Sequence, residues 1–183
     1  MRIIGGTLSG KQILAPKNLP IRPTTDFAKE GLFNILNNRI DFEDCLVLDL
    51  FSGTGNIALE FASRGAKKIT AIDMHSPCLN FLRDTAKALK LNSIFTERAD
   101  VFKFLEKAHS TYDVIFADPP YDLENIPAIH DLVYKNNLLN EEGLLIIEHS
   151  IKTNLSDKEF FIDTRKYGNV NFSFFRKTGQ NVL

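Results

Sequence analysis

The feature that most constrains the fold is a regular alternation of short apolar segments with longer amphipathic ones between residues 45 and 149. The first apolar segment, 45–51, is apolar on both faces, which is typical of a strand buried in a parallel sheet. Segment 76–90 instead carries leucine and alanine at helical spacing. The expected strands are 45–51, 68–73, 93–98, 112–117 and 143–149, and the expected helices are 56–64, 76–90, 101–108 and 125–136.

The two ends of the chain add elements to these repeats. Residues 159–164 and 170–175 have no helix-length pattern between them, so they predict a closing antiparallel hairpin. The fold class is therefore α/β: a Rossmann-like, doubly wound, seven-stranded and mostly parallel sheet with one antiparallel strand.

The N-terminal part is expected to precede the main fold as an extension. Arg2–Ile4 and Gln12–Leu14 flank a stretch rich in Gly, Ser and Thr, which predicts a β-hairpin. A helix should follow from Thr25 or Asp26 to about Asn38. We expect residues 1–40 to form this hairpin and helix extension and residues 41–183 to form the main domain.

Composition narrows the class of protein. The 183 residues are 44% apolar, which suffices for the core of one domain. No run reaches membrane-spanning length, and the first residues lack a signal-peptide apolar stretch. Cys45 and Cys78 have no CxxC spacing, and the four histidines show no metal-ligand spacing, so we expect a cytoplasmic protein with reduced thiols and no metal.

Charge is unevenly distributed although the net charge is only −1. Residues 1–40 hold six Lys/Arg against two acids, and residues 151–183 hold six against three, so the segment between them carries a charge of −8. Basic terminal segments of this kind favour a polyanionic partner, although solvated surfaces also produce them.

A glycine-rich turn follows the first strand of the main domain. Gly53, Gly55 and Ala58 fit the GxGxxA pattern, and Asp73 lies 20 residues after Gly53, which taken literally is a dinucleotide fingerprint. Asp49, just before the turn, would repel a pyrophosphate and attract a cation. S-adenosylmethionine is such a ligand, since it carries a sulfonium, an ammonium and no phosphate. A P-loop is excluded because no Gly-Lys-Ser/Thr follows the turn.

Further polar residues end the neighbouring strands, where ligands of such sheets bind. We expect Asp49 to face the methionine end, Asp73 to bind the ribose hydroxyls, and Asp100 with the Val101 backbone to bind adenine. Each acid also has a purely structural interpretation, as a turn former or a helix cap. The expected cofactor-binding residues are Asp49, Phe51, Gly53, Gly55, Asp73, Met74, Asp100 and Val101.

The fourth strand ends in Asp118-Pro119-Pro120-Tyr121. The carboxylate and a proline-side carbonyl can accept the two N–H protons of a nucleobase amino group, while the tyrosine stacks on the base. Each proline fixes its φ near −65°, so the acceptors stay aligned. These four residues are the predicted catalytic residues, although a strand followed by a proline turn has the same pattern.

The chain resembles the RsmD-type 16S rRNA guanine-N2 methyltransferases over nearly its full length. The matching segments are Arg2–Gly6, Arg22–Asp26, Glu30–Asn34, Asp49–Gly55, Ser63–Ala66 and Asp118–Tyr121. The resemblance implies a class I methyltransferase that transfers a methyl group from S-adenosylmethionine to N2 of a guanine in 16S rRNA, guanine 966 in this family. The substrate would be an assembled or assembling small ribosomal subunit. The sequence shows no obvious interface helix, so we expect a monomer.

Some assignments remain open at this point. Arg22, Thr24 and Thr25 are candidate RNA contacts, or Arg22 is simply a surface residue before a helix. The first alternative function is an amino-methyltransferase acting on adenine N6 of DNA or another RNA. A nicotinamide-dependent oxidoreductase is disfavoured by Asp49, and a non-catalytic RNA-binding domain by the intact pocket.

Overall fold

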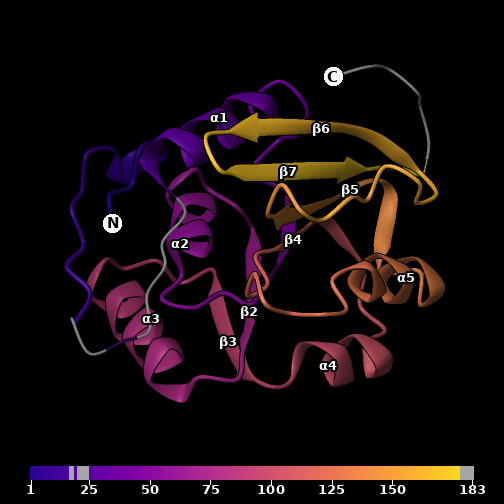
Figure 1. Ribbon diagram of the computed structural model, residues 1–183. Helices are drawn as coiled ribbons and strands as arrows, with labels where there is room; N and C mark the ends of the chain where they lie inside the picture. The colour runs from indigo at the N-terminus through magenta and orange to yellow at the C-terminus, as the bar shows by residue number, and fades with distance from the viewer. Residues whose placement is uncertain (17–18, 20–24, 178–183) are drawn as a thin grey trace.

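The computed structural model describes residues 1–16, 19 and 25–177. Its centre is a seven-stranded sheet in the order β3-β2-β1-β4-β5-β7-β6 (Figure 1). The strands are β1 (Leu46–Leu50), β2 (Lys68–Asp73), β3 (Ile94–Arg98), β4 (Tyr112–Ala117), β5 (Leu139–His149), β6 (Phe161–Tyr167) and β7 (Val170–Phe175). The helices are η1 (Gly6–Leu8), α1 (Asp26–Leu36), α2 (Asn56–Ser63), α3 (Ser76–Ala88), α4 (Val101–Lys107) and α5 (Pro127–Lys135).

The strand directions confirm the predicted sheet. Strands β1 to β5 pair in parallel, whereas β7 pairs antiparallel with both β5 and β6. The chain moves outward from β1 to β3 and then returns to β4 on the other side of β1. This reversal puts the carboxyl ends of β1 and β4 side by side, at the point where doubly wound sheets bind ligands.

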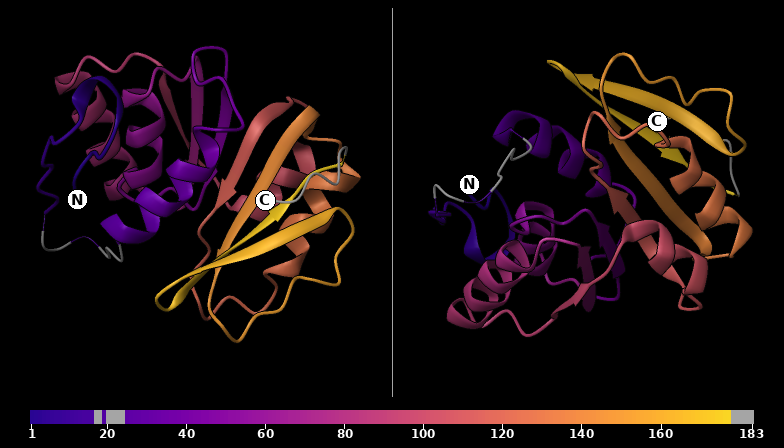
Figure 2. Two further views of the ribbon diagram at one scale, coloured as in Figure 1. Left: turned by 90° about the horizontal axis from the view of Figure 1, so that it is seen from above. Right: turned by 60° about the horizontal axis from the view of Figure 1, so that its bottom comes forward.

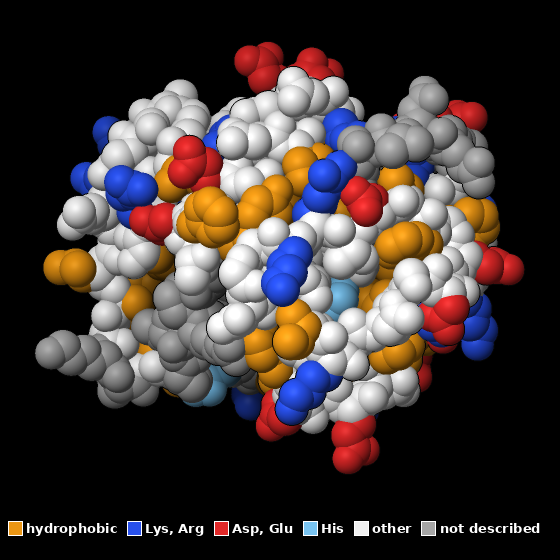
Figure 3. All heavy atoms as spheres, turned by 45° about the horizontal axis from the view of Figure 1, so that its top comes forward, with side chains coloured by type: hydrophobic (Ala, Val, Ile, Leu, Met, Phe, Trp, Pro, Cys, Tyr) orange, Lys and Arg blue, Asp and Glu red, His pale blue; other side chains and the backbone are white. Residues whose placement is uncertain are grey.

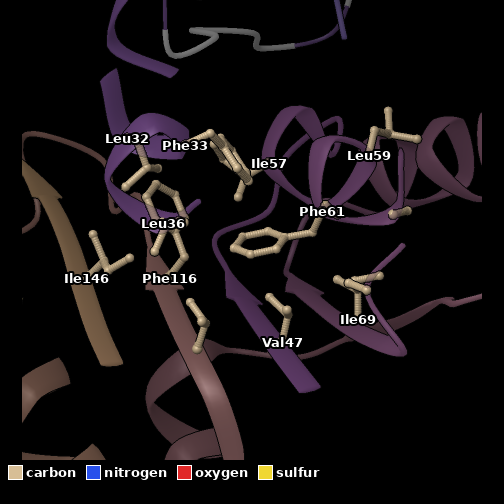
Figure 4. Packing of buried hydrophobic residues seen from close by; sticks show 14 of the residues in the cluster. Leu32, Phe33, Leu36, Val47, Ile57, Leu59, Phe61, Ile69, Phe116 and Ile146 are labelled. Carbon is tan, nitrogen blue, oxygen red and sulfur yellow. The ribbon is translucent and has the colours of Figure 1, made fainter. Parts of the chain in front are cut away.

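Helices cover both faces of the sheet (Figure 2). One core cluster joins α1, α2 and part of α3 to the sheet, and the other joins α4 and α5 to the opposite face. The rings of Phe33 in α1 and Phe61 in α2 meet edge to face with centroids 4.9 Å apart, and Figure 4 shows Phe61 above Val47 of the sheet. Helix α1 therefore shares its core with β1, and the domain boundary expected near residue 40 stays a prediction.

The N-terminal hairpin is shorter than the sequence predicts. Arg2 and Gln12 form an antiparallel bridge, and backbone hydrogen bonds on either side of it join Met1 to Ile13 and Ile3 to Lys11. The one-turn helix η1 occupies much of the expected loop. The physical reason is that backbone N–H groups bind elsewhere: those of Ile4 and Gly5 donate to the Glu60 carboxylate at 2.9 and 2.8 Å. The N-terminal segment is thus attached to α2 instead of forming a longer ladder.

A buried ion pair attaches α1 to the same helix. The side chains of Lys29 and Glu60 are almost fully buried, with the Lys29 ammonium 3.2 Å from the carboxylate. Lys29 also donates to the side-chain oxygen of Asn56 at 2.9 Å and to the carbonyl of Arg2. Glu60 accepts a further bond from Arg64 at 3.0 Å. Because these buried charges neutralise one another, removing one side chain leaves its partners with less compensation in a place that water cannot reach.

The chain contains two free cysteines, Cys45 and Cys78, and both are buried. Within the ranges that the structure describes, no helix is both long and apolar enough to cross a membrane. In the same ranges, no group of three or more His, Cys, Asp or Glu side chains is arranged to hold a metal ion.

We expect Lys29→Met to lower the free energy of unfolding by about 3–5 kcal/mol, because it removes one of the two cations that neutralise the buried Glu60 carboxylate and also the hydrogen bond that Lys29 donates to the side-chain oxygen of Asn56. Urea unfolding followed by circular dichroism measures the change. The matched control is Lys67→Met, which removes an exposed ion pair with Asp44 and should cost about 0–1 kcal/mol. Equal losses for the two variants would contradict a structural role for the buried pair.

Candidate active site

The turn after β1 has an unusual backbone. Phe51 has a φ of +58°, Gly53 of +52° and Gly55 of +82°. A positive φ costs glycine little but strains a residue with a side chain such as Phe51, and such strain clusters at functional sites. Gly55 is also needed for packing, since a Cβ there would lie 2.2 Å from a methyl carbon of Leu82. At Gly53 a Cβ would meet no atom within 4 Å, so the turn is open to a ligand at that residue.

Asp49 lies behind this turn and is only 1% exposed. Its carboxyl oxygen accepts a hydrogen bond from the backbone N–H of Ala58 at 3.1 Å, in the first turn of α2. Burial raises the pKa of Asp49 to about 8, the Ala58 bond opposes this, and the charge of Asp73 adds to it. The side chain thus supports the turn from inside the fold, and its expected role toward a methionine group remains a prediction.

Asp73, at the end of β2, fixes the turn from the other side. One carboxylate oxygen accepts the Gly53 N–H at 2.8 Å, and the other accepts the His75 N–H at 2.7 Å. The cap of α3 is His75, whose ring nitrogen accepts from Cys78. The structure therefore brings together Asp73 and the glycine turn, which lie 20 residues apart in the sequence.

The third expected acid, Asp100, follows β3, the strand next to β2, at the same edge of the sheet. Asp100 caps α4 by accepting the Lys103 N–H at 2.9 Å, and the adjacent Val101 is buried. Strands β2 and β3 pair through Asp73 and Arg98, so Asp100 lies two residues beyond that register. Met74 is 61% exposed, and its carbonyl accepts a bond from Arg98. The cap interpretation of Asp100 is observed, and contact with adenine stays a prediction.

The residues around the turn fit a nucleoside cofactor. Gly53 leaves open space, the Asp73 carboxylate offers acceptor oxygens, and both lie at the carboxyl edge of the sheet. Among the described side chains, the buried Ser52 hydroxyl is one of the polar groups with no hydrogen-bond partner. A buried hydroxyl of this kind calls for a partner, which a polar ligand at the turn can supply.

The Asp118–Tyr121 segment follows β4 directly beside the turn. The backbone N–H of Asp118 donates to the carbonyl of Leu50, the last residue of β1, at 3.3 Å. Asp118 is half-buried, Pro119 buried and Pro120 exposed. Tyr121 is half-buried, and its hydroxyl donates to the Glu148 carboxylate at 3.4 Å. The four predicted catalytic residues thus begin one residue beyond β4, adjacent to the end of β1.

Sequence reasoning missed two groups around this site. Glu148 is 3% exposed and holds the Tyr121 ring from β5; the signal was an acid inside the apolar run of that strand. Asn56, directly after Gly55, accepts a hydrogen bond from the buried Lys29 ammonium, and the sequence around Asn56 does not predict that contact. Of the expected RNA contacts, Arg22 and Thr24 lie outside the described residues, whereas Thr25 caps α1 by accepting the Ala28 N–H.

Known proteins share this architecture. The model of the protein family described as "Conserved hypothetical protein 95" matches residues 1–176 of this chain. "Ribosomal RNA small subunit methyltransferase D" of Buchnera aphidicola subsp. Baizongia pistaciae is 34% identical over 149 residues, which are 81% of this chain and 75% of that protein. The protein of the same name from Escherichia coli is 31% identical over 155 residues, 85% of this chain and 77% of that protein.

Solved structures agree with these relatives. "Putative methyltransferase yhhF from Escherichia coli" superposes with a TM-score of 0.84 at 28% identity, covering 96% of each chain. The fold is that of a class I methyltransferase, whose cofactor is S-adenosylmethionine. Within that class, the chain belongs to the family described as conserved hypothetical protein 95, which contains the RsmD-type enzymes.

The raised pKa of Asp49 predicts a pH dependence of stability. A carboxyl pKa that is higher in the folded state than in the unfolded one stabilises the fold at low pH, and this stability is lost as pH rises toward about 8. We expect wild type to lose up to ~1.4 kcal/mol per pH unit, relative to Asp49→Asn, between about pH 5 and 7. Urea unfolding of both proteins across that range measures it. Parallel curves would show that Asp49 is ionised in the fold.

Proposed function

We propose that this chain transfers a methyl group from S-adenosylmethionine to the exocyclic N2 of a guanine in 16S rRNA of the small ribosomal subunit. The observation that carries the proposal is the contact between Asp118 and Leu50, because it joins the Asp-Pro-Pro-Tyr segment to the end of β1 where the cofactor turn begins. One pocket edge then presents a site for the methyl donor and a site for an amino group.

S-adenosylmethionine supplies a methyl group on a positively charged sulfur. The Asp118 carboxylate and the Pro119 carbonyl accept the two N–H bonds of the base amino group, which directs the nitrogen lone pair out of the ring plane. Asp118 need not be a strong base, because the nitrogen becomes acidic only after it has been methylated. The contribution of the protein is therefore mainly positioning and electrostatics.

The tyrosine of the segment provides the stacking surface. Its hydroxyl is bound to Glu148, and Glu148 is itself buried in β5, so the ring is held from outside its own loop. A guanine must leave its stack to reach this ring and the Asp118 carboxylate, which favours a nucleotide in a single-stranded RNA region.

The choice of ribosomal RNA rests on relatives and on charge. The relatives are named ribosomal RNA small subunit methyltransferases, and the basic segments 1–40 and 151–183 suit a polyanion. Guanine N2 is the family's expected target. Because the Asp-Pro-Pro-Tyr clamp can hold any exocyclic amino group, adenine N6 of DNA or another RNA is the second candidate.

The direct test incubates the protein and labelled S-adenosylmethionine with small ribosomal subunits from cells that lack this gene, and with DNA in parallel. Nucleoside analysis of the digested RNA should find the label in N2-methylguanosine. Label in N6-methyladenosine, or only in DNA, would contradict the proposed target while keeping the methyltransferase class.

Loss of the Asp118 carboxylate should separate chemistry from cofactor binding. One charge-assisted hydrogen bond corresponds to about 1.5–3 kcal/mol, so Asp118→Ala should lower kcat roughly ten- to a hundredfold. Calorimetric binding of S-adenosylhomocysteine should be unchanged. The matched control is Asp122→Ala, an exposed acid in the same loop. Turnover of Asp118→Ala within twofold of wild type would exclude the clamp.

A further inference from the structure

A groove of about 590 Å³ opens on the molecule between α1 and the edge strand β6, apart from the cofactor turn. Phe27, Gly31, Asn34 and Arg39 line it from the α1 side, and Arg165 and Tyr167 line it from β6. From Phe27 to Arg39 the chain follows α1 and its C-terminal turn over roughly 18 Å, at a rise of about 1.5 Å per residue. The groove is therefore long enough for several nucleotides of an extended strand.

Two aromatic rings form one end of this groove. Phe27 is 68% exposed, and its ring meets that of Tyr167 edge to face, with centroids 5.7 Å apart. Tyr167 lies directly on Gly31, where a Cβ would come within 2.1 Å of the tyrosine ring. The absence of a side chain at Gly31 thus lets the Tyr167 ring contact α1 closely and support the exposed Phe27 ring. Exposed, supported aromatic faces are the surfaces on which single-stranded bases stack.

The rest of the groove lining carries two arginines, Arg39 and Arg165. Burial lowers the pKa of the Arg39 guanidinium, and the positive charges of Arg176 and Arg165 lower it further, so three guanidinium groups act on one another here. Arg165 and Arg176 are each near one acid, Asp163 at 2.8 Å and Glu142 at 3.6 Å. The acid in the groove lining is Glu30. Figure 3 shows basic and hydrophobic side chains close together on this side of the molecule.

The register of the sheet connects this groove to the Asp118–Tyr121 segment. Arg165 of β6 is paired with Phe172 of β7, which is paired with Glu148 of β5, the residue that binds the Tyr121 hydroxyl. Directly opposed residues of antiparallel strands point to the same face of the sheet. Arg165 therefore lies about 10 Å from Glu148, at two strand spacings, and faces the same side.

We propose that the groove between α1 and β6 binds the single-stranded RNA that flanks the methylated nucleotide. Arg39 and Arg165 contact its phosphates, and a base stacks on Phe27 against Tyr167. The inference takes its substrate class, RNA, from the proposed function. It adds the place on the protein where the RNA lies outside the catalytic pocket. Aromatic rings beside guanidinium groups are used by proteins that bind single strands without reading their sequence.

The experiment measures binding of a fluorescein-labelled 12-nucleotide single-stranded RNA of mixed sequence across a series of salt concentrations. The variants are Arg39→Gln combined with Arg165→Gln, and separately Phe27→Ala. We expect the double variant to bind about tenfold or more weakly and to lower the slope of log affinity against log salt by about 1.4, since each phosphate contact on a single strand contributes about 0.7. Phe27→Ala should weaken binding at least about fivefold with the slope unchanged.

The matched control removes two positive charges elsewhere, by Lys87→Gln combined with Lys107→Gln on the exposed ends of α3 and α4. It should bind the RNA like wild type. All variants should bind S-adenosylhomocysteine within twofold of wild type, which shows that they are folded. With small ribosomal subunits as substrate, the groove variants should raise KM and leave kcat unchanged.

Three outcomes would overturn the inference: wild type fails to bind the 12-mer, the double variant matches wild type in affinity and slope, or only activity on subunits falls. The last would assign the groove to a ribosomal protein. If wild type transfers no methyl group to subunits while the 12-mer affinity still responds to the variants, the proposed function fails and the RNA groove stands.

Discussion

The parallel pairing of β1 with β4 is the constraint on which the site depends. It brings Leu50 and Ala117 into register, and the chain then leaves both strands at the same edge of the sheet. One exit forms the glycine turn and the other forms the Asp-Pro-Pro-Tyr segment, still joined by the Asp118 to Leu50 hydrogen bond. A methyl donor and an acceptor amine can meet only if the glycine turn and the Asp-Pro-Pro-Tyr segment stay side by side. The pairing of Leu50 with Ala117 keeps them so.

Buried ionisable groups behind that edge keep the turn in place. Asp49 holds the first turn of α2 from inside, and the buried Lys29 ammonium reaches Asn56 from α1. The expectation that Asp49 attracts a cation as a charged carboxylate needs one refinement. Burial raises the pKa of Asp49 to about 8, so much of this charge appears only when a nearby cation favours its ionisation. The same buried position makes the residue part of the fold.

Much of the fold was predictable because its signals are local. The apolar runs of the strands and the 3.6-residue spacing of the helices gave the order of the elements, and the terminal hairpin gave the single antiparallel strand. Thr25 as the cap of α1 was also predictable, since a threonine directly before an acid such as Asp26 is a helix start signal. The N-terminal hairpin is present but short, because a distant carboxylate, that of Glu60, takes the N–H groups of Ile4 and Gly5. For the site, motif and strand position predicted the acids. The acid in the apolar run of β5 marked Glu148 as unusual, but sequence spacing does not show that its partner is Tyr121.

The most direct test of this account is a crystal structure with bound S-adenosylhomocysteine. The account predicts that the nucleoside lies over Gly53 and Gly55, with its ribose at Asp73 and its sulfur facing the segment from Asp118 to Tyr121. A ligand whose sulfur faces away from Asp118, or a turn that instead binds a phosphate-bearing molecule, would contradict it.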